Sequence, residues 1–281
     1  MCKDDRKDRY RVKKAWNRVI GSIAAAVLVC TVTGCGGDIG EEKELPVITV
    51  GSDNYPPYNY LDEDGVATGI DVELATEAFR RMGYKTEFKY IDWEKKTEMV
   101  EDGSIDCIMG CFSIEGRQDD YKWAGSYMVS RQVVAVKADS DIYTLADLAG
   151  RKIAVQSTTK PEGIFLNRTD SRIPEIGQLI CMEKRELIHT FLAKGYVDAV
   201  AAHETSILQY MKDYDVDYRI LDEPLMTVGI GVAFSKDDER GICEEMDKTL
   251  EEMRTDGTSA KIIGKYLENP ENYLEVEQLG Y

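Results

Sequence analysis

The sequence predicts an α/β protein made of two similar lobes with a ligand cleft between them. Strand-like and helix-like segments alternate along the chain, a pattern typical of α/β folds with a largely parallel sheet. The order of these segments then repeats in the second half of the chain. A length of 281 residues is enough for one or two domains with a sizeable core.

The first 34 residues have the organisation of an export signal. A basic segment (residues 3–18) precedes an apolar segment (residues 19–33) that is too short to span a bilayer comfortably. The following VTGCGG resembles a bacterial lipobox, so we expect residues 1–34 to be removed and Cys35 to carry a lipid. The alternatives are an ordinary signal peptide with an incidental Cys35, or an uncleaved anchor. Residues 35–45 are polar and without periodicity, which predicts a flexible tether.

The charge of the chain is unevenly distributed. The first 34 residues carry eight Lys and Arg against three Asp, a net charge of +5. Since the whole chain carries −17, the remainder carries −22. Nucleic-acid binders need basic surface, so this balance excludes a nucleic-acid partner.

The first lobe is expected to open with a strand and a hairpin that turns at Asp64-Gly65. A helix then places Val72, Ala75, Phe79 and Met82 on one face. In order, the expected segments are a strand at 47–52, the hairpin at 58–70, a helix at 71–83, a strand at 85–91, a helix at 94–103 and a buried strand at 105–113.

Two stretches of the first half are echoed in the second. ITVGSDNYPP at residues 48–57 matches IAVQSTTKPE at 153–162, and EDGSIDCIMGCFS at 101–113 matches LAKGYVDAVAAHETS at 192–206. Ligands of open α/β sheets sit outside the carboxyl ends of the strands. The loops expected to line the cleft are therefore Ser52–Tyr58, Gly110–Arg117, Ser157–Glu162 and His203–Ser206.

The end of the chain has no counterpart in the second repeat. A strand at 227–236 and two helices broken at Asp256-Gly257 are expected to return to the first lobe. We therefore expect two crossings between the lobes, which make a hinge. The expected domains are residues 46–136 plus 230–281 for lobe 1 and residues 137–229 for lobe 2.

The cysteines beyond Cys35 fit neither a disulfide framework nor a zinc motif. Cys107 and Cys111 lie four apart in a strand-like run, about 13 Å from each other, too far to form a disulfide. We expect these two, Cys181 and Cys243 to be core thiols, and the sequence leaves a Cys181–Cys243 bridge open.

Four motifs in order resemble one protein family. They are VGSDNYPPYNYLDEDGVATGIDVELATEAF, GSIDCIMGCFSIEGR, LADLAGRKIAVQSTTKPE and RTDGTSAKIIGKYL, and the likeness covers about Pro46 to Leu267. The chain resembles an extracytoplasmic solute-binding protein of the polar amino-acid ABC-transporter type, with the type II periplasmic-binding fold. The resemblance implies two Rossmann-like lobes joined by a two-crossing hinge. It also implies a monomer that captures an amino-acid-like solute without a cofactor or metal and docks on a membrane ABC permease. A lipobox further implies a lipid-anchored protein on the outside of a cell membrane, in a Gram-positive bacterium.

The resemblance also suggests which residues of the first lobe contact the ligand. Tyr55 maps to an aromatic wall, with Tyr58 nearby, and Trp93 maps to an apolar or aromatic contact. Arg117 maps to the group that holds the α-carboxylate, because a guanidinium donates two parallel bonds to a carboxylate. Ser113 and Arg117 are one residue closer in this sequence than the Ser and Arg of the family's usual S-x-T-x-x-R motif. The neighbouring loop residues expected to contribute are Gly110, Cys111, Phe112 and Ser113.

In the second lobe the resemblance points to two loops. Ser157, Thr158 and Thr159 occupy the place of a hydroxyl-rich loop at the start of a helix, which suits an anion. N-capping of that helix is the alternative role. His203 stands where an Asp usually binds the ligand's ammonium, and Glu204 follows it. Either the carboxylate role has moved to Glu204, or the ligand lacks a standard ammonium.

Two other functions remain open from the sequence. The same fold hosts cyclohexadienyl-type dehydratases, and a His203-Glu204 pair could supply a general acid, although nothing else in the sequence forms a catalytic constellation. A receptor that senses its solute rather than transporting it is the third possibility.

Overall fold

In residues 44–279, the part of the chain that the computed structural model describes, the strands form one large mixed sheet and a small hairpin. The expected leader (residues 1–34) and the lipidated Cys35 lie outside the described residues. The strands are β1 (Val47–Ser52), β2 (Tyr60–Leu61), β3 (Ala67–Thr68), β4 (Lys85–Tyr90), β5 (Cys107–Ile108), β6 (Lys122–Lys137), β7 (Lys152–Gln156), β8 (Gln178–Met182), β9 (Ala199–His203), β10 (Tyr218–Ile220) and β11 (Met226–Phe234).

Residues 44–279 contain seven α-helices, of which the first two and the last two lie close to the expected positions. They are α1 (Ile70–Arg81), α2 (Lys96–Glu101), α3 (Lys160–Asn167), α4 (Arg185–Lys194), α5 (Glu204–Tyr214), α6 (Ile242–Thr255) and α7 (Thr258–Ile263), with short 3₁₀ turns at Trp93–Lys95, Leu145–Leu148, Pro270–Tyr273 and Val276–Leu279. Gly69 precedes α1 with a φ of 123°, and a Cβ there would collide with the carbonyl oxygens of Pro57 and Tyr58. Glycine is therefore required where the hairpin passes into α1.

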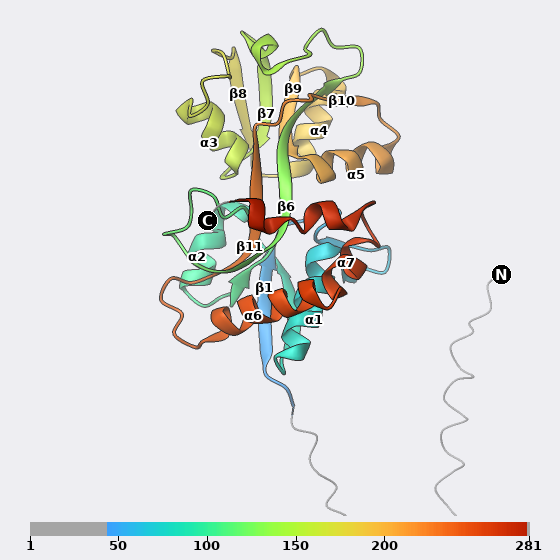
Figure 1. Ribbon diagram of the computed structural model, residues 1–281. Coiled ribbons are helices and arrows are strands. Elements are labelled where there is room, and N and C mark those ends of the chain that lie inside the picture. The colour runs from blue at the N-terminus through green and yellow to red at the C-terminus, as the bar shows by residue number, and fades with distance from the viewer. Residues whose placement is uncertain (1–43, 280–281) are drawn as a thin grey trace, which may run out of the picture. The chain divides into compact units, whose positions relative to one another are not determined.

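The predicted repeat is confirmed by the strand pairing. β1 pairs in parallel with β4 and β5, and β7 pairs in parallel with β8 and β9. The two parallel units are joined by β11 and β6, which pair antiparallel with each other and with β5 and β9. The sheet is thus mixed rather than largely parallel. Figure 1 shows β6 and β11 running through both lobes.

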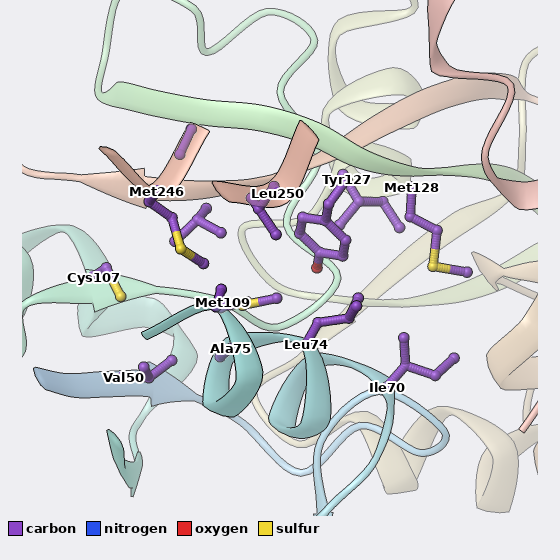
Figure 2. Close-up of a cluster of buried hydrophobic side chains, with 14 of the residues drawn as sticks. Val50, Ile70, Leu74, Ala75, Cys107, Met109, Tyr127, Met128, Met246 and Leu250 are labelled. Carbon is purple, nitrogen blue, oxygen red and sulfur yellow. The ribbon is translucent and has the colours of Figure 1, made fainter. Parts of the chain in front are cut away.

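The core of the first lobe lies between α1, α6 and the sheet. Leu74 and Ala75 of α1, Met109 after β5, and Met246 of α6 are fully buried in one cluster (Figure 2). Ile262 and Ile263 of α7 belong to the same cluster, so α7 packs on the first lobe. Truncating such a side chain to Ala typically costs about 2–5 kcal/mol.

The second lobe has a core on each face of its sheet. Val134 and Val136 pack in one cluster with α3, and Val133 and Ala135 pack in another with α4 and α5, because successive strand side chains point to opposite faces. Met128, earlier in β6, belongs to the first-lobe core. We therefore place the lobe boundary inside β6, before Val133. This proposal differs from the expected boundary after residue 136, since β6 pairs with β9 of the second lobe from Gln132 to Val136.

Candidate functional site

A pocket lies between the lobes, where β1 and β5 of the first lobe and β7 and β9 of the second end. Its walls are formed by Tyr55, Trp93, Gly110, Cys111, Phe112, Ser113, Arg117, Gln132, Gln156, Thr158, Thr159, Lys160, Pro161, Arg185, Ala201, Ala202 and His203. The cavity volume is about 20 Å³, room for about one water molecule. This volume is smaller than a solute of amino-acid size.

Most of the residues expected to contact the ligand line this pocket. They are Tyr55, Trp93, Gly110, Cys111, Phe112, Ser113, Arg117, Thr158, Thr159 and His203. Tyr58, Ser157 and Glu204 do not line it. The predicted strand at 105–113 is shorter than expected, since β5 ends at Ile108 and the backbone then turns through Cys111, whose φ is 51°.

Glu204 and Tyr58 have structural partners instead. Glu204 is the first residue of α5, and its carboxylate accepts a hydrogen bond from Arg131 Nη1 at 2.9 Å. It borders a separate surface hollow beside Tyr273, outside the pocket between the lobes. Tyr58 is buried beside Tyr55, with ring centres 5.4 Å apart, and its hydroxyl lies 2.5 Å from Thr205 Oγ1.

The ring of His203 is fixed by two side chains of β6. His203 Nδ1 lies 2.8 Å from Ser130 Oγ, and His203 Nε2 lies 2.7 Å from Gln132 Nε2. An amide nitrogen can only donate, so His203 Nε2 accepts and Nδ1 carries the proton. Burial, with Arg185 and Arg117 nearby, lowers the pKa of His203 to about 3. His203 is therefore a neutral wall group with both nitrogens already bonded.

Arg117 reaches the pocket despite its short spacing from Ser113. Its Nη1 donates to Ser113 O at 3.2 Å and its Nη2 donates across the cleft to Thr158 O at 3.0 Å. The guanidinium carbon lies 4.9 Å from the centre of the Phe112 ring. Two backbone carbonyls and a ring face thus hold the guanidinium, and they leave its full positive charge at the pocket.

The turn before α3 differs from the expected anion site. Thr158 has a φ of 57°, and its N–H donates to Glu162 Oε2 at 2.7 Å, so a carboxylate of the protein already takes this donor. The Thr159 hydroxyl donates to Gln156 O at 2.6 Å. The hydroxyl of Thr158 accepts a hydrogen bond from Lys96 Nζ at 2.9 Å. This hydroxyl therefore retains a hydrogen to donate to another group.

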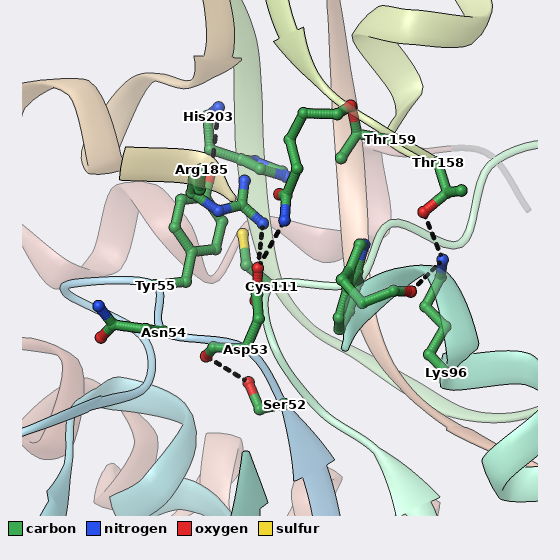
Figure 3. Close-up of polar contacts among 12 residues, drawn as sticks. Ser52, Asp53, Asn54, Tyr55, Lys96, Cys111, Thr158, Thr159, Arg185 and His203 are labelled. Atoms are coloured by element: carbon green, nitrogen blue, oxygen red, sulfur yellow. Dashed lines mark hydrogen bonds and ion pairs between the residues drawn. The ribbon is translucent and has the colours of Figure 1, made fainter. Parts of the chain in front are cut away.

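Asp53, Gln156 and Arg185 form a polar network that was not among the expected site residues. Figure 3 shows Asp53 and Arg185 of this network. Asp53 Oδ2 accepts from Gln156 Nε2 at 2.8 Å and from Arg185 Nη2 at 3.2 Å, and both bonds cross the cleft. Gln156 Nε2 also donates to Glu183 O, which fixes the orientation of the amide. Among the described residues, no donor reaches Gln156 Oε1 or Asp53 Oδ1, although both atoms are buried.

Part of this network had a signal in the sequence. Gln156 is the last residue of β7. It lies one position before Ser157–Glu162, a loop expected to line the cleft because it follows the carboxyl end of a strand. Arg185 follows β8, a strand that is absent from the expected segments. Gln132 lies in the middle of β6, where an amide in an apolar run was the only available clue.

A buried carboxylate supports the loop that carries Gly110 to Ser113. Asp71 is fully buried in the first turn of α1 and accepts from Cys111 N at 2.7 Å and from the Tyr127 hydroxyl at 2.8 Å. Burial raises the pKa of Asp71 to about 6, and the two hydrogen bonds partly oppose this. Asp71 thus holds the backbone of Cys111 in its left-handed conformation.

Two lysines add positive charge beside Arg117. Lys96 is buried; its Nζ donates to Trp93 O at 3.0 Å and lies 4.9 Å from the centre of the Trp93 ring. Lys160 lines the pocket from the first position of α3. Burial, with Arg117 as the next cause, lowers the pKa of each lysine to about 8.

The cysteines differ from expectation at one position. Cys107, Cys111 and Cys243 are buried free thiols, but Cys181 of β8 is exposed. Cys181 is therefore not a core thiol, and it forms no bridge with Cys243, which lies in α6 of the first lobe. Within residues 44–279, no group of three or more His, Cys, Asp or Glu side chains is arranged to hold a metal ion.

Comparison with known proteins connects this geometry to one family. The family model of bacterial extracellular solute-binding proteins, family 3, matches residues 48–269. The L-cystine-binding protein of Bacillus subtilis is 28% identical over 228 residues, covering 80% of this chain and 82% of the relative. The glutamate-binding protein of Corynebacterium glutamicum is 25% identical over 285 residues, covering 91% and 92%.

A solved structure, an ancestral arginine-binding protein bound to arginine, has the same fold. Its TM-score is 0.72 at 28% identity, covering 79% of this chain and 98% of that chain.

None of the helices within the described range is long and apolar enough to span a membrane.

Proposed function

Because the chain belongs to the bacterial extracellular solute-binding proteins of family 3, we propose that it is the binding subunit of an ABC importer for a carboxylate-bearing amino acid or a close relative. The similar proteins named above bind cystine, glutamate or arginine, which supports a solute of this size and kind. Because cystine, glutamate and arginine differ in net charge, these relatives do not indicate the charge of the solute.

The observation that carries the proposal is the position of Arg117. A half-buried guanidinium at the pocket wall, bonded to the carbonyls of Ser113 and Thr158, presents a charge that a ligand carboxylate matches. A planar fork of donors suits a carboxylate better than a single ammonium does. Arg117 therefore binds the α-carboxylate.

The α-ammonium then needs acceptors other than His203. His203 is neutral and both its nitrogens are bonded, so it cannot replace the usual Asp. Gln156 Oε1 is buried, and the two acceptors held by Gln156 Nε2 fix its orientation. We assign the ammonium to Gln156 Oε1, with the charge of Asp53 behind it.

Binding is coupled to closure of the lobes. Polar contacts from Asp53, Tyr58, Lys96 and Arg117 cross the cleft to the second lobe, while β6 and β11 are the continuous strands between the lobes. The small cavity volume means that the solute enters an open form. A solute that touches both lobes favours the closed form, which then docks on the permease.

A dehydratase activity is less well supported than binding. The catalytic hypothesis relied on the His203-Glu204 pair as a general acid. An imidazole with a pKa of about 3 has no proton to give at neutral pH, and Glu204 does not line the pocket. Lipid attachment at Cys35 and a place outside the cell membrane remain part of the proposal. Loss of palmitate labelling on Cys35→Ala would test them.

A thermal-shift screen of the purified protein against amino acids tests the proposed function. A true ligand raises the melting temperature with concentration, because it binds only the folded state. Arg117→Met should reduce affinity by about 10- to 100-fold, since a charge-assisted pair to a carboxylate is lost. If no carboxylate-bearing amino acid shifts the melting temperature, or if Arg117→Met binds unchanged, the proposal is wrong.

A further inference from the structure

Three basic side chains converge on one turn of the second lobe. Lys96 donates to the Thr158 hydroxyl at 2.9 Å, Arg117 donates to Thr158 O at 3.0 Å, and Lys160 is two positions further along the chain. Two of these cations also lie near the same aromatic ring. Lys96 Nζ is 5.8 Å and Arg117 Cζ is 4.9 Å from the centre of the Phe112 ring. These side chains come from three separate elements, so local sequence alone does not bring them together.

This charge is costly for the folded protein. Lys96 is only 4% exposed, and its hydrogen bonds go to a carbonyl and a hydroxyl rather than to a carboxylate. Arg117 is likewise bonded to two carbonyls. By contrast, Arg185 at the same pocket is matched by Asp53 at 3.2 Å. Burying the Lys96 ammonium beside the Arg117 guanidinium is unfavourable, and the nearby carboxylates of Asp53, Glu162 and Glu94 oppose this cost only in part.

A single ligand carboxylate on Arg117 leaves the lysine charge in place. Lys160 lines the pocket, and its ammonium lies close to Gly116, in the loop that carries Arg117. The Thr158 hydroxyl, which accepts from Lys96, has its hydrogen available for an acceptor in the pocket. Lys160 and Thr158 thus form a second donor site beside Arg117.

We propose that the solute carries a second acid group, held by Lys160 and the Thr158 hydroxyl, while Lys96 supports that hydroxyl and adds its charge. The inference rests on the proposed function, because it names the class of amino acid that the same cleft takes. The preferred ligands are acidic amino acids, and basic ones are excluded by the same charge. Burial, and then the nearby Arg117, lower the pKa of both lysines, and a bound anion would favour their charged forms.

Isothermal titration calorimetry with matched pairs of solutes tests the inference. L-glutamate and L-glutamine have nearly the same shape but differ by one charge, as do L-aspartate and L-asparagine. We expect an acidic amino acid to bind at least tenfold more tightly than its amide, and L-arginine to bind more weakly than either. If glutamine, asparagine or arginine binds as well as the acids, the inference is wrong while the proposed function stands. If no amino acid binds, the proposed function fails and the inference with it.

Lysine variants assign the preference to this site. Lys160→Met should lower affinity for the acidic solute by about tenfold or more and change affinity for its amide less than threefold. Lys160→Arg keeps the charge and should keep the preference, which separates lost charge from disturbed folding. Lys248→Met, at an exposed position on α6, is the matched control and should leave both affinities unchanged. An acid-to-amide ratio that stays the same in Lys160→Met would overturn the assignment.

Discussion

The guanidinium carbon of Arg185, in the second lobe, lies 3.2 Å from the centre of the Tyr55 ring in the first lobe. The same guanidinium pairs with Asp53 at 3.2 Å, and its side chain is almost fully buried. The aromatic face that the sequence assigned to the ligand is therefore in contact with a cation of the protein itself. A buried cation on an aromatic face stabilises the closed arrangement of the lobes.

Removing Arg185 should favour the open form. Arg185→Met keeps most of the apolar stem but removes both the ion pair and the ring contact. Breaking a buried pair costs about 3–5 kcal/mol when the remaining charge stays buried. Here Asp53 can regain water if the lobes separate, so the free energy of unfolding should fall by less than this. Small-angle X-ray scattering without ligand should show a larger radius of gyration than for the unchanged protein.

The control for that experiment is Arg168→Met. Arg168 pairs with Glu175 on the surface of the second lobe, and both side chains are largely exposed. Such pairs contribute about 0–1 kcal/mol, so neither scattering nor stability should change. Scattering from Arg185→Met that matches the unchanged protein would show that Arg185 does not hold the lobes together.

Acidification should destabilise the protein through its buried histidines. Burial lowers the pKa of His203 to about 3 and that of His189 to about 4, against an unfolded value of about 6.5. Below pH 6.5 the unfolded chain binds protons that the folded protein does not, so stability falls with pH until the folded pKa is reached. From pH 7 to pH 5, His203→Gln should lose about 2 kcal/mol less than the unchanged protein in urea unfolding. An equal loss in both proteins would contradict the low pKa of His203.

Asp71 has the opposite effect on stability over a nearby pH range. Its pKa of about 6 lies above the unfolded value of about 3.9, so the folded protein takes up a proton first as pH falls from 6 to 4. This group therefore adds stability on acidification, and it costs stability at neutral pH. Asp71→Asn removes that gain, so its free energy of unfolding should fall more steeply between pH 6 and pH 4 than that of the unchanged protein. Parallel curves would show that burial does not raise the pKa of Asp71.

The fold and much of the pocket wall could be predicted from the sequence because they follow local rules. Alternation of strands and helices, a repeated order of elements and the strand-end rule were enough to bring Tyr55, Ser113 and Arg117 to one cleft. These signals lie within short stretches of chain. These signals can be recognised in the sequence because each apolar strand is followed directly by a polar loop.

The remaining site residues depend on contacts between distant segments. Arg185 matters because α4 brings it across the cleft to Asp53, a distance of 132 residues along the chain. His203 was in the right place, but its role depends on Ser130 and Gln132 of β6, which bond both ring nitrogens. Glu204 lies outside the cleft because it begins α5 and pairs with Arg131. No pattern in the sequence indicated this pairing.

The affinity for an acidic solute should fall as pH rises above about 8. Lys96 and Lys160 each have a pKa of about 8, lowered first by burial and then by Arg117. Asp53, Glu162 and Glu94 around Lys96, and Glu115 and Asp120 around Lys160, act in the opposite direction. A bound acid group favours the charged lysine and so raises its pKa. Binding near pH 8 should therefore take up protons, and each lysine that loses its proton should weaken binding by up to about tenfold per pH unit.

Calorimetry at pH 8 in two buffers checks this prediction. If protons are taken up, the observed heat of binding differs between Tris and phosphate, because the two buffers release protons with different enthalpies. The Lys160→Met variant should show a smaller buffer dependence and a flatter decline of affinity between pH 8 and pH 9.5. Lys248→Met, whose exposed side chain pairs with Glu252 on the same helix, is the control: this exposed pair should not affect binding, so the variant should behave like the unchanged protein. A heat of binding that is the same in both buffers would mean that neither lysine gains a proton when the solute binds, and that the second acid group is held elsewhere.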